Sequence, residues 1–370
     1  MKVICQQQQL SKALNIVTKA VTTRTTIPIL KGILLEASSD GVLKIAASDL
    51  DLSIEKKIKT TVVEEGAIVV SSRLFTDIIR KLPNEDIEIE VQENNTMKIK
   101  CLASEFMIIG QSAEEFPNIG EIKEEKAISI DKEIFKDMIK RTSFSASIDE
   151  SKGIIVGVLI EMEKEVFTMV ALDGFRMAVN KEYMKSEENR KIIVAARILN
   201  EISKILSEDD KEKELSLILD EKKAVIYLAD TRIVLRLLEG DFIKYKEIIP
   251  KEYKCRIKLH RTDFLDSIER ASLLAKEGKN NLIKISLNDN KMTITSRSEE
   301  GNVKEEVFIE KEGENLDIGF NSKYLLDVLK TISDEEIAME FNTSVSPCLI
   351  RPISGNLFDY LILPVRITAS

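Results

Sequence analysis

The sequence predicts an α+β protein of three similar domains, each built from two halves in which one helix is followed by strands. Amphipathic helical segments recur about every 60 residues, and every second one starts about 125 residues after its counterpart. The runs between them have the composition and alternation of strands and are separated by turn residues. The expected domains are 1–124, 125–250 and 251–370.

Six segments carry apolar residues on one helical face, which predicts six helices. These segments are 9–20, 71–82, 131–142, 196–206, 262–276 and 321–331. Ser71, Asp131, Thr262 and Asn321 stand at four of the starts and are residue types that favour the N-cap position. We therefore expect these side chains to cap their helices.

Hairpins are expected between the helices, and one of them looks like a catalytic site. Asp173, Gly174, Phe175 and Arg176 lie between the apolar runs of "ALDGFRMAV". Asp–Gly between alternating runs is a strong hairpin signal. Asp49 in "AASDLDLSI" lies 124 residues earlier at a matching corner. A turn shared by two repeats is structural first, although an enzyme that uses Asp173 and Arg176 in a cleft stays a rival.

Composition excludes several function classes. The chain has 370 residues, 44% of them hydrophobic, and a net charge of −9, so large folded cores are expected. Its apolar runs are too short to span a membrane, and its start lacks a signal-peptide pattern. The four Cys, at 5, 101, 255 and 348, have no metal-ligand spacing. We expect a reduced, cytoplasmic protein.

No motif for catalysis or for a cofactor stands out. Patterns for a P-loop, a dinucleotide-binding turn, a nucleophile elbow or a zinc protease are lacking. His260 is the one histidine, and it is expected at the surface just before a helix. We expect no enzyme activity, no cofactor and no metal.

Positive charge gathers on the expected helices. They contain 15 Lys and Arg against 9 Asp and Glu, a net +6, so the rest of the chain carries −15. Four helices repeat a basic pair seven residues apart, which places each pair on one face. The pairs are Lys12 and Lys19, Arg73 and Arg80, Arg197 and Lys204, and Lys323 and Lys330. Lys132, Lys136 and Lys140 form a further stripe. This pattern favours a protein that binds a polyanion without recognising a base sequence.

Geometry favours a ring of two chains. Packed helices lie about 8–10 Å apart, so six helices form a circle with a diameter of only about 20 Å, whereas twelve form one of about 35–40 Å. Duplex DNA, with grooves about 8 Å deep, is itself about 20 Å wide. A head-to-tail dimer can therefore surround a duplex, and heterologous contacts that close make rings.

The chain resembles the bacterial DNA polymerase III beta subunit family, the sliding clamps, over essentially its whole length. The resemblance rests on an ordered series of segments, of which "NSKYLLDVL" and the ending "LILPVRI" are the most specific. The others are "MKVICQQQQLSKAL", "RTTIPIL", "SSRLFTDIIRKLP", "EEFPNIGEI", "ALDGFRMAV" and "GDFIKYKEIIP". It implies the DNA clamp fold, closed as a head-to-tail homodimeric ring with helices inside and sheets outside.

The resemblance also implies a groove between the second and third domains that binds short peptides. The matching positions are Ile155, Leu172, Gly174, Phe175, Arg176, Met177, Ile243, Glu247, Ile248, Leu361, Ile362, Leu363, Pro364, Val365 and Arg366. Apolar side chains from a hairpin and a chain end suit Leu and Phe anchors. Leu172, Phe175, Ile243 and Glu247 depart from the residues common in the family, which leaves the peptide preference open.

For DNA, the resemblance implies contacts at Arg24, Arg73 and Lys152, and the helical spacing adds Arg80, Arg197 and Lys204. Gly153 and Ile154 replace aromatic residues found in some members, so base stacking is not expected there. At the dimer seam the resemblance implies apolar contacts by Phe106 and Leu273, and edge strands there are expected to pair.

The sequence thus predicts a DNA polymerase processivity factor. Its ring is expected to slide on double-stranded DNA without sequence preference. The expected protein partners are the replicative polymerase, the clamp loader and repair proteins, each through a short peptide. The alternative is a repeat scaffold that binds proteins but does not slide.

Overall fold

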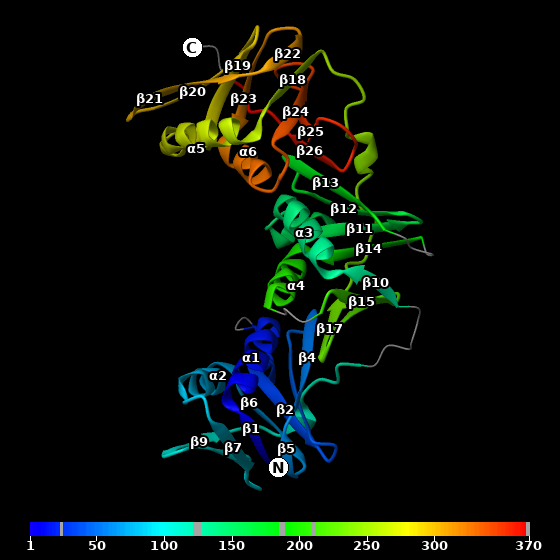
Figure 1. Ribbon diagram of the computed structural model, residues 1–370, viewed down its shortest axis with the longest axis vertical. Helices are drawn as coiled ribbons and strands as arrows, with labels where there is room; N and C mark the ends of the chain where they lie inside the picture. Colours follow the sequence, from blue (N-terminus) through cyan, green and yellow to red (C-terminus); the bar gives the residue numbers. More distant parts are fainter. Residues whose placement is uncertain (23–24, 121–126, 185–188, 209–211, 368–370) are drawn as a thin grey trace. The chain divides into compact units, whose positions relative to one another are not determined.

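The computed structural model describes residues 1–22, 25–120, 127–184, 189–208 and 212–367. The chain forms two compact units (Figure 1). Unit 1 contains Met1–Phe135 and Glu201–Leu237, and unit 2 contains Lys136–Asn200 and Leu238–Ser370. The expected middle domain, 125–250, therefore contributes residues to both units.

All six expected helices are confirmed, with ends that differ by a few residues. They are α1 (Gln7–Val17), α2 (Ser72–Lys81), α3 (Lys132–Thr142), α4 (Ala196–Glu208), α5 (Arg261–Glu277) and α6 (Ser322–Leu329). Asp131 accepts a hydrogen bond from the N–H of Ile134, and Asn321 accepts one from Lys323. The capping prediction is wrong at Ser71, which makes no side-chain cap, and at Thr262, which lies inside α5 because that helix begins directly after His260.

The described residues of unit 1 form two antiparallel sheets. The first has the order β5 (Thr61–Glu64), β1 (Lys2–Gln6), β7 (Asp86–Val91), β8 (Thr96–Cys101) and β9 (Ser104–Ile109). The second has the order β10 (Ile128–Asp131), β15 (Glu214–Leu219), β16 (Lys223–Leu228), β17 (Thr231–Arg236), β4 (Leu52–Lys59), β3 (Val42–Ser48), β2 (Gly32–Ser38) and β6 (Gly66–Ser71). Helix α1 packs on β3 and β4, and α2 packs on β2 and β6.

Unit 2 also contains two antiparallel sheets. The larger has the order β14 (Arg190–Ala195), β11 (Gly157–Glu163), β12 (Val166–Leu172), β13 (Arg176–Tyr183), β26 (Phe358–Ile362), β25 (Cys348–Pro352), β24 (Glu336–Phe341), β18 (Cys255–His260) and β22 (Glu310–Gly313). The smaller has the order β21 (Gly301–Phe308), β20 (Lys291–Ser298), β19 (Leu282–Asn288) and β23 (Leu316–Asn321). Glu150–Val156, directly before β11, is a 3₁₀ helix.

Strand order repeats three times in groups of four. One kind of group is β1-β7-β8-β9, then β10-β15-β16-β17, then β18-β24-β25-β26. The other kind is β6-β2-β3-β4, then β14-β11-β12-β13, then β23-β19-β20-β21. Each group accompanies one helix, so the two-halves repeat expected from the sequence is confirmed.

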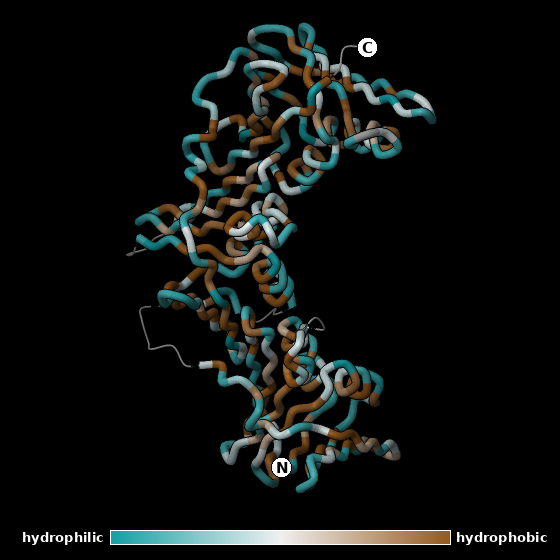
Figure 2. Tube along the Cα trace, turned by 180° about the vertical axis from the view of Figure 1, so that it is seen from behind, coloured by the Kyte–Doolittle hydropathy of each residue, from teal (hydrophilic) through white to brown (hydrophobic). Residues whose placement is uncertain are grey.

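Two of these groups join along the β4–β17 ladder in unit 1, and two join along the β13–β26 ladder in unit 2. These junctions occupy equivalent places in the repeat, since β4 corresponds to β13 and β17 to β26. They turn pairs of four-stranded groups into continuous sheets of eight and nine strands. Apolar residues follow the strands of both units, while turns are mostly polar (Figure 2).

Candidate functional site

The turn between β12 and β13 is held by Asp173. Its Oδ1 accepts hydrogen bonds from the N–H groups of Phe175 at 2.8 Å and Arg176 at 3.0 Å. Asp49 makes the same pattern with the N–H groups of Asp51 and Leu52, at 3.0 and 2.7 Å. The shared geometry explains why an Asp recurs at both corners and assigns this residue a structural role.

Arg176 uses its guanidinium to hold three segments of unit 2 together. Its Nε lies 3.1 Å from Asp173 and its Nη1 lies 2.5 Å from Asp327 on α6, while Nη2 donates to the carbonyl of Phe144 at 2.8 Å. The side chain is only 10% exposed, and it lies between the rings of Phe144 and Tyr324. With its donors engaged in this way, Arg176 serves the fold rather than a reacting group.

Phe175, at the tip of the same turn, is 54% exposed. Its ring stacks on Tyr324 of α6 with 6.4 Å between centroids, and the ammonium of Lys152 lies 5.8 Å from its centroid. Lys152 was expected to face DNA and Phe175 to face peptides, and the structure brings the two together. Tyr324 was not predicted as a site residue, because nothing local in its helix connects it with a turn far away in the sequence.

Apolar residues next to this turn form what we call the hairpin cluster. Its buried members are Leu159, Val170, Leu172, Met177, Val179, Ile193, Tyr245, Leu349 and Leu361. Leu172, Met177 and Leu361 were predicted as peptide-groove residues, and Ile155, also predicted, packs against the cluster. Tyr245, Phe242 and Ile249 come from residues 238–250, which connect β17 to β18, and were not predicted.

The remaining predicted groove residues divide into three sets. Ile362 lies in the core beneath α5 and α6, on the opposite face of the sheet from Leu361, because successive strand residues alternate. The N–H of Leu363 donates to the carbonyl of Phe175 at 2.8 Å, and that of Val365 donates to Gly319 at 2.8 Å. Exposed or partly exposed positions complete the set: Gly174, Ile243, Glu247, Ile248, Pro364 and Arg366.

The basic residues predicted to face DNA lie in different surroundings. Arg24 lies outside the described residues. Arg73, Lys152 and Arg197 are exposed. The second member of each seven-residue pair has an acidic partner within 3 Å: Lys19 with Glu208, Arg80 with Asp77, Lys204 with Glu201, and Lys330 with Glu269. The stripe expected on α3 is interrupted, because Lys132 is buried.

Strands β9 and β21, each at one edge of its sheet, expose apolar side chains. On β9, Phe106 is 39% exposed and Ile109 84% exposed, and Phe308 on β21 is 88% exposed. Leu273 projects from α5 and is 65% exposed. Exposed edges of this kind invite pairing with another strand.

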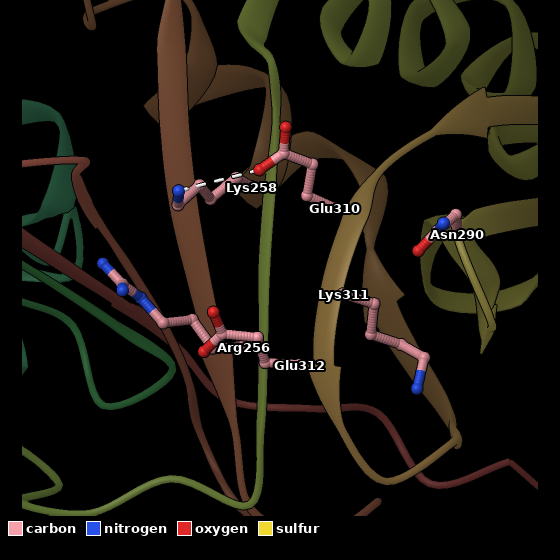
Figure 3. A pocket seen from close by; sticks show the side chains of 6 residues that line it. All are labelled: Arg256, Lys258, Asn290, Glu310, Lys311 and Glu312. Atoms are coloured by element: carbon pink, nitrogen blue, oxygen red, sulfur yellow. Dashed lines mark ion pairs between the residues drawn. The ribbon is translucent and has the colours of Figure 1, made fainter.

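One pocket of about 250 Å³ lies beside β18 and β22 in unit 2 (Figure 3). Its lining is Arg256, Lys258, Asn290, Glu310, Lys311 and Glu312. Lys258 and Glu310 form an ion pair across the two strands. Both signs of charge are present, so the lining favours no particular class of ligand. Within the described part of the chain, no helix is both long and apolar enough to cross a bilayer.

Comparison with known proteins agrees with this architecture. Residues 1–120, 129–244 and 246–366 match, respectively, the N-terminal, central and C-terminal domains of the DNA polymerase III beta subunit. The beta sliding clamp of Bacillus subtilis is 36% identical over 99% of this chain and 100% of its own length.

Solved structures give the same result. The Bacillus subtilis DNA polymerase sliding clamp superimposes with a TM-score of 0.95 at 35% identity, covering 99% of each chain. A putative DNA polymerase III beta subunit from Eubacterium rectale gives 0.95 at 34% identity, covering 99% of this chain and 100% of that one. The three-domain clamp fold is therefore shown, and the chain belongs to the DNA polymerase III beta subunit family, the beta sliding clamps that act as DNA polymerase processivity factors.

Proposed function

We propose that two copies of this chain close head to tail into a ring that encircles duplex DNA and slides on it. The ring tethers the replicative polymerase, and it also receives the clamp loader and repair proteins through short peptides. It works in the cytoplasm and catalyses no reaction of its own. The single observation that carries the proposal is the repeated junction between four-stranded groups.

Within one chain the junction occurs twice, at β4–β17 and at β13–β26. The two strands that would form a third junction have no partner strand in the same chain. Strand β21 corresponds to β4 and β13, while β9 corresponds to β17 and β26. Both β9 and β21 are sheet edges. If β21 of one copy pairs with β9 of a second copy, all three junctions are alike and both edges disappear.

The two existing junctions specify the register of this third one. Ile54 pairs with Ile233 and Ala178 pairs with Tyr360, and all four are fully buried. Equivalent residues at the seam are found by counting along β21 and β9 from the turns of the β20–β21 and β8–β9 hairpins. The equivalent pair is Val303 with Phe106 of the second copy. This pairing buries the exposed Phe106 ring, which stabilises the ring closure.

A charge pair follows from the same register. The next residues at the first junction are Glu55 and Arg232, whose side chains lie 2.7 Å apart. Their equivalents at the seam are Lys304 and Glu105 of the second copy. The signs are exchanged but remain opposite, which favours this register over one shifted by a residue.

Leu273 occupies the equivalent helical position. Lys19, Phe144 and Leu273 each stand thirteen residues after the last residue of the preceding strand, namely Gln6, Asp131 and His260. Lys19 contacts Glu208, and the ring of Phe144 lies 6.1 Å from that of Tyr360. In each case the contact reaches the neighbouring four-stranded group. Leu273 is therefore placed to contact the second copy, which supplies the neighbouring group at the seam.

The helices support loose rather than tight attachment to DNA. Four of their basic side chains are already neutralised by acidic partners, which leaves fewer cations for phosphate. Few and exchangeable phosphate contacts allow sliding, whereas a strongly basic lining would hold the DNA in place. Retention then depends on the ring, and tethering raises the local concentration of polymerase.

Peptide binding is assigned to the exposed side of the hairpin cluster. Ile155, Leu172, Met177 and Leu361 supply its apolar floor, with Phe175 and Leu363 at the margin. Leu and Phe side chains of a partner peptide suit such a surface. The apolar Phe175 and acidic Glu247 favour peptides that are apolar near one end and free of acidic residues near the other.

The decisive experiment loads the protein onto a nicked circular DNA with a clamp loader and then cuts the circle once. A sliding ring leaves the linear DNA through its ends, so the bound fraction falls to the level of a control without a loader. A scaffold that binds DNA or DNA-bound proteins locally stays attached. Retention that is unaffected by cutting would refute the sliding ring and favour the scaffold.

A further inference from the structure

Residues 238–250, which we call the linker segment, cover the hairpin cluster in unit 2. The segment is fixed at its start, where the N–H of Leu238 donates to the carbonyl of Ile193 at 2.8 Å. Tyr245 is 5% exposed and belongs to the cluster, and Phe242 and Ile249 pack against it. The linker segment is therefore part of the wall of the proposed peptide surface.

A buried carboxylate fastens the middle of this segment. Glu161 on β11 is 3% exposed, and its Oε2 accepts a hydrogen bond from the hydroxyl of Tyr245 at 2.6 Å. Its Oε1 lies 2.6 Å from Nζ of Lys191 on β14, and Nζ of Lys246 lies 3.7 Å from Oε2. One carboxylate thus joins two strands of the sheet to the linker segment.

The protonation states of Glu161 and Tyr245 favour a strong hydrogen bond between them. Burial raises the pKa of Glu161, but hydrogen bonds from Lys191 and Tyr245 and the charges of Lys246 and Lys191 outweigh it, so the pKa lies below its usual value. Burial and the Glu161 carboxylate raise the pKa of Tyr245. At neutral pH an ionised acceptor meets a protonated donor, and such charge-assisted bonds are shorter and stronger than neutral ones.

Tyr245 stands between predicted peptide contacts. Ile243 precedes it by two residues and is 40% exposed, while Ile248 follows by three and is 42% exposed. Because the buried Tyr245 lies between them in the chain, its position determines the direction in which Ile243 and Ile248 point. The sheet side of the same cluster carries Leu172 and Leu361.

We propose that Glu161, supported by Lys191, is a positioning residue for the binding of partner peptides. Its bond to Tyr245 holds the linker segment at the spacing from the hairpin cluster that an apolar peptide side chain requires. The inference rests on the proposed peptide binding and adds the residues that hold the binding surface in position. None of the three side chains in this arrangement needs to touch the peptide.

The test measures the dissociation constant of a fluorescently labelled peptide with adjacent Leu and Phe residues near its carboxyl end. Tyr245→Phe and Glu161→Gln each weaken binding about 10-fold or more, the effect of losing a hydrogen bond to a charged group. The double variant is no weaker than the weaker-binding single variant, because both changes break one bond. Tyr183→Phe and Glu336→Gln, at exposed positions on β13 and β24 of the same sheet, leave the constant unchanged.

A second readout reports on the linker segment itself. Trypsin cleaves after Lys244 and Lys246, and both lysines are exposed. Cleavage there is several-fold faster in Tyr245→Phe than in the wild type, while the midpoint of thermal unfolding changes little. Lys191→Gln removes a partner of Glu161 at a side chain that is 61% exposed, so it tests the same idea without disturbing the core.

The outcomes separate the two claims. Wild-type protein that fails to bind the peptide overturns the peptide-binding part of the proposed function, and this inference with it. Wild-type binding together with unchanged affinity in Tyr245→Phe, Glu161→Gln and Lys191→Gln overturns only the inference. Weaker binding and faster cleavage, without loss in the two control variants, support it.

Discussion

Arg176 and Asp327 are separated by 151 residues in the sequence, yet Nη1 of the arginine lies 2.5 Å from Oδ2 of the aspartate. The contact joins the turn that precedes β13 to helix α6. It lies beside the Phe175–Tyr324 stack, so the stability of this corner and the shape of the proposed peptide surface depend on the same side chains.

Arg176→Ala is therefore expected to lower the free energy of unfolding by about 3 kcal/mol, since it leaves two carboxylates and a carbonyl without their partner. Urea denaturation followed by circular dichroism measures the change. Arg80→Ala removes an arginine from an exposed pair with Asp77 and should cost less than about 1 kcal/mol. Equal losses in both variants would contradict the role assigned to Arg176.

The proposed seam register predicts a charge exchange. Lys304→Glu and Glu105→Lys each place like charges opposite one another across the seam, so each weakens the dimer in sedimentation experiments. The double variant restores opposite charges and should recover most of the loss. If the double variant is weaker than either single variant, the register is wrong.

Apolar contacts at the same seam are tested by Phe106→Asp and Leu273→Asp. A buried carboxylate without a partner is costly, so each variant is expected to sediment as a monomer at concentrations where the wild type is a dimer. Ile148→Asp is the matched control, because Ile148 is 99% exposed and lies outside the seam. A persistent dimer in both seam variants would refute the assignment of these residues.

The helices should differ in their importance for DNA. Arg73 is exposed, whereas Arg80 shares its charge with Asp77 at 2.8 Å. Arg73→Ala is expected to reduce loader-dependent loading on DNA more than Arg80→Ala, and the difference should shrink as salt is raised, because each phosphate contact contributes less at higher salt. Loading of both variants over a salt series measures the effect. The reverse order would mean that the ion pair opens when DNA is present.

The thiols should be unreactive in the folded chain. All four cysteines are buried, and burial, together with the charge of Asp86, raises the pKa of Cys5 to about 12. A thiol reagent at pH 8 should modify none of them in the native state and all four in denaturant, because the thiolate is the reactive form. Rapid modification of the native protein would contradict this burial.

The same shift gives a pH dependence with a definite sign. Between the ordinary thiol pKa of 9.0 and about 12, the unfolded chain releases a proton that folded Cys5 retains. Its contribution to stability is therefore complete below pH 9 and is lost as the pH rises toward 12. Cys5→Ser should reduce the slope of stability against pH in that window.

Local patterns in the sequence determined a large part of this protein. Apolar residues spaced as on one helical face located all six expected α-helices, and alternating runs beside Asp173–Gly174 located the β12–β13 hairpin. These patterns depend on neighbours in the chain, so they can be found without knowing the fold. The repeat of about 125 residues adds correspondence between distant segments, whereas Phe106 and Leu273 were predicted from the resemblance to the sliding clamp family.

Only the tertiary structure decided which distant side chains meet. Glu161 and Tyr245, 84 residues apart, form their bond because the linker segment packs against the hairpin cluster. Ile362 and Leu361 are neighbours in the sequence but enter opposite cores, because the β13–β26 register decides which residue of the strand faces α5 and α6. Periodicity determines that a residue faces one side of its element, whereas register and packing between elements determine what lies on that side.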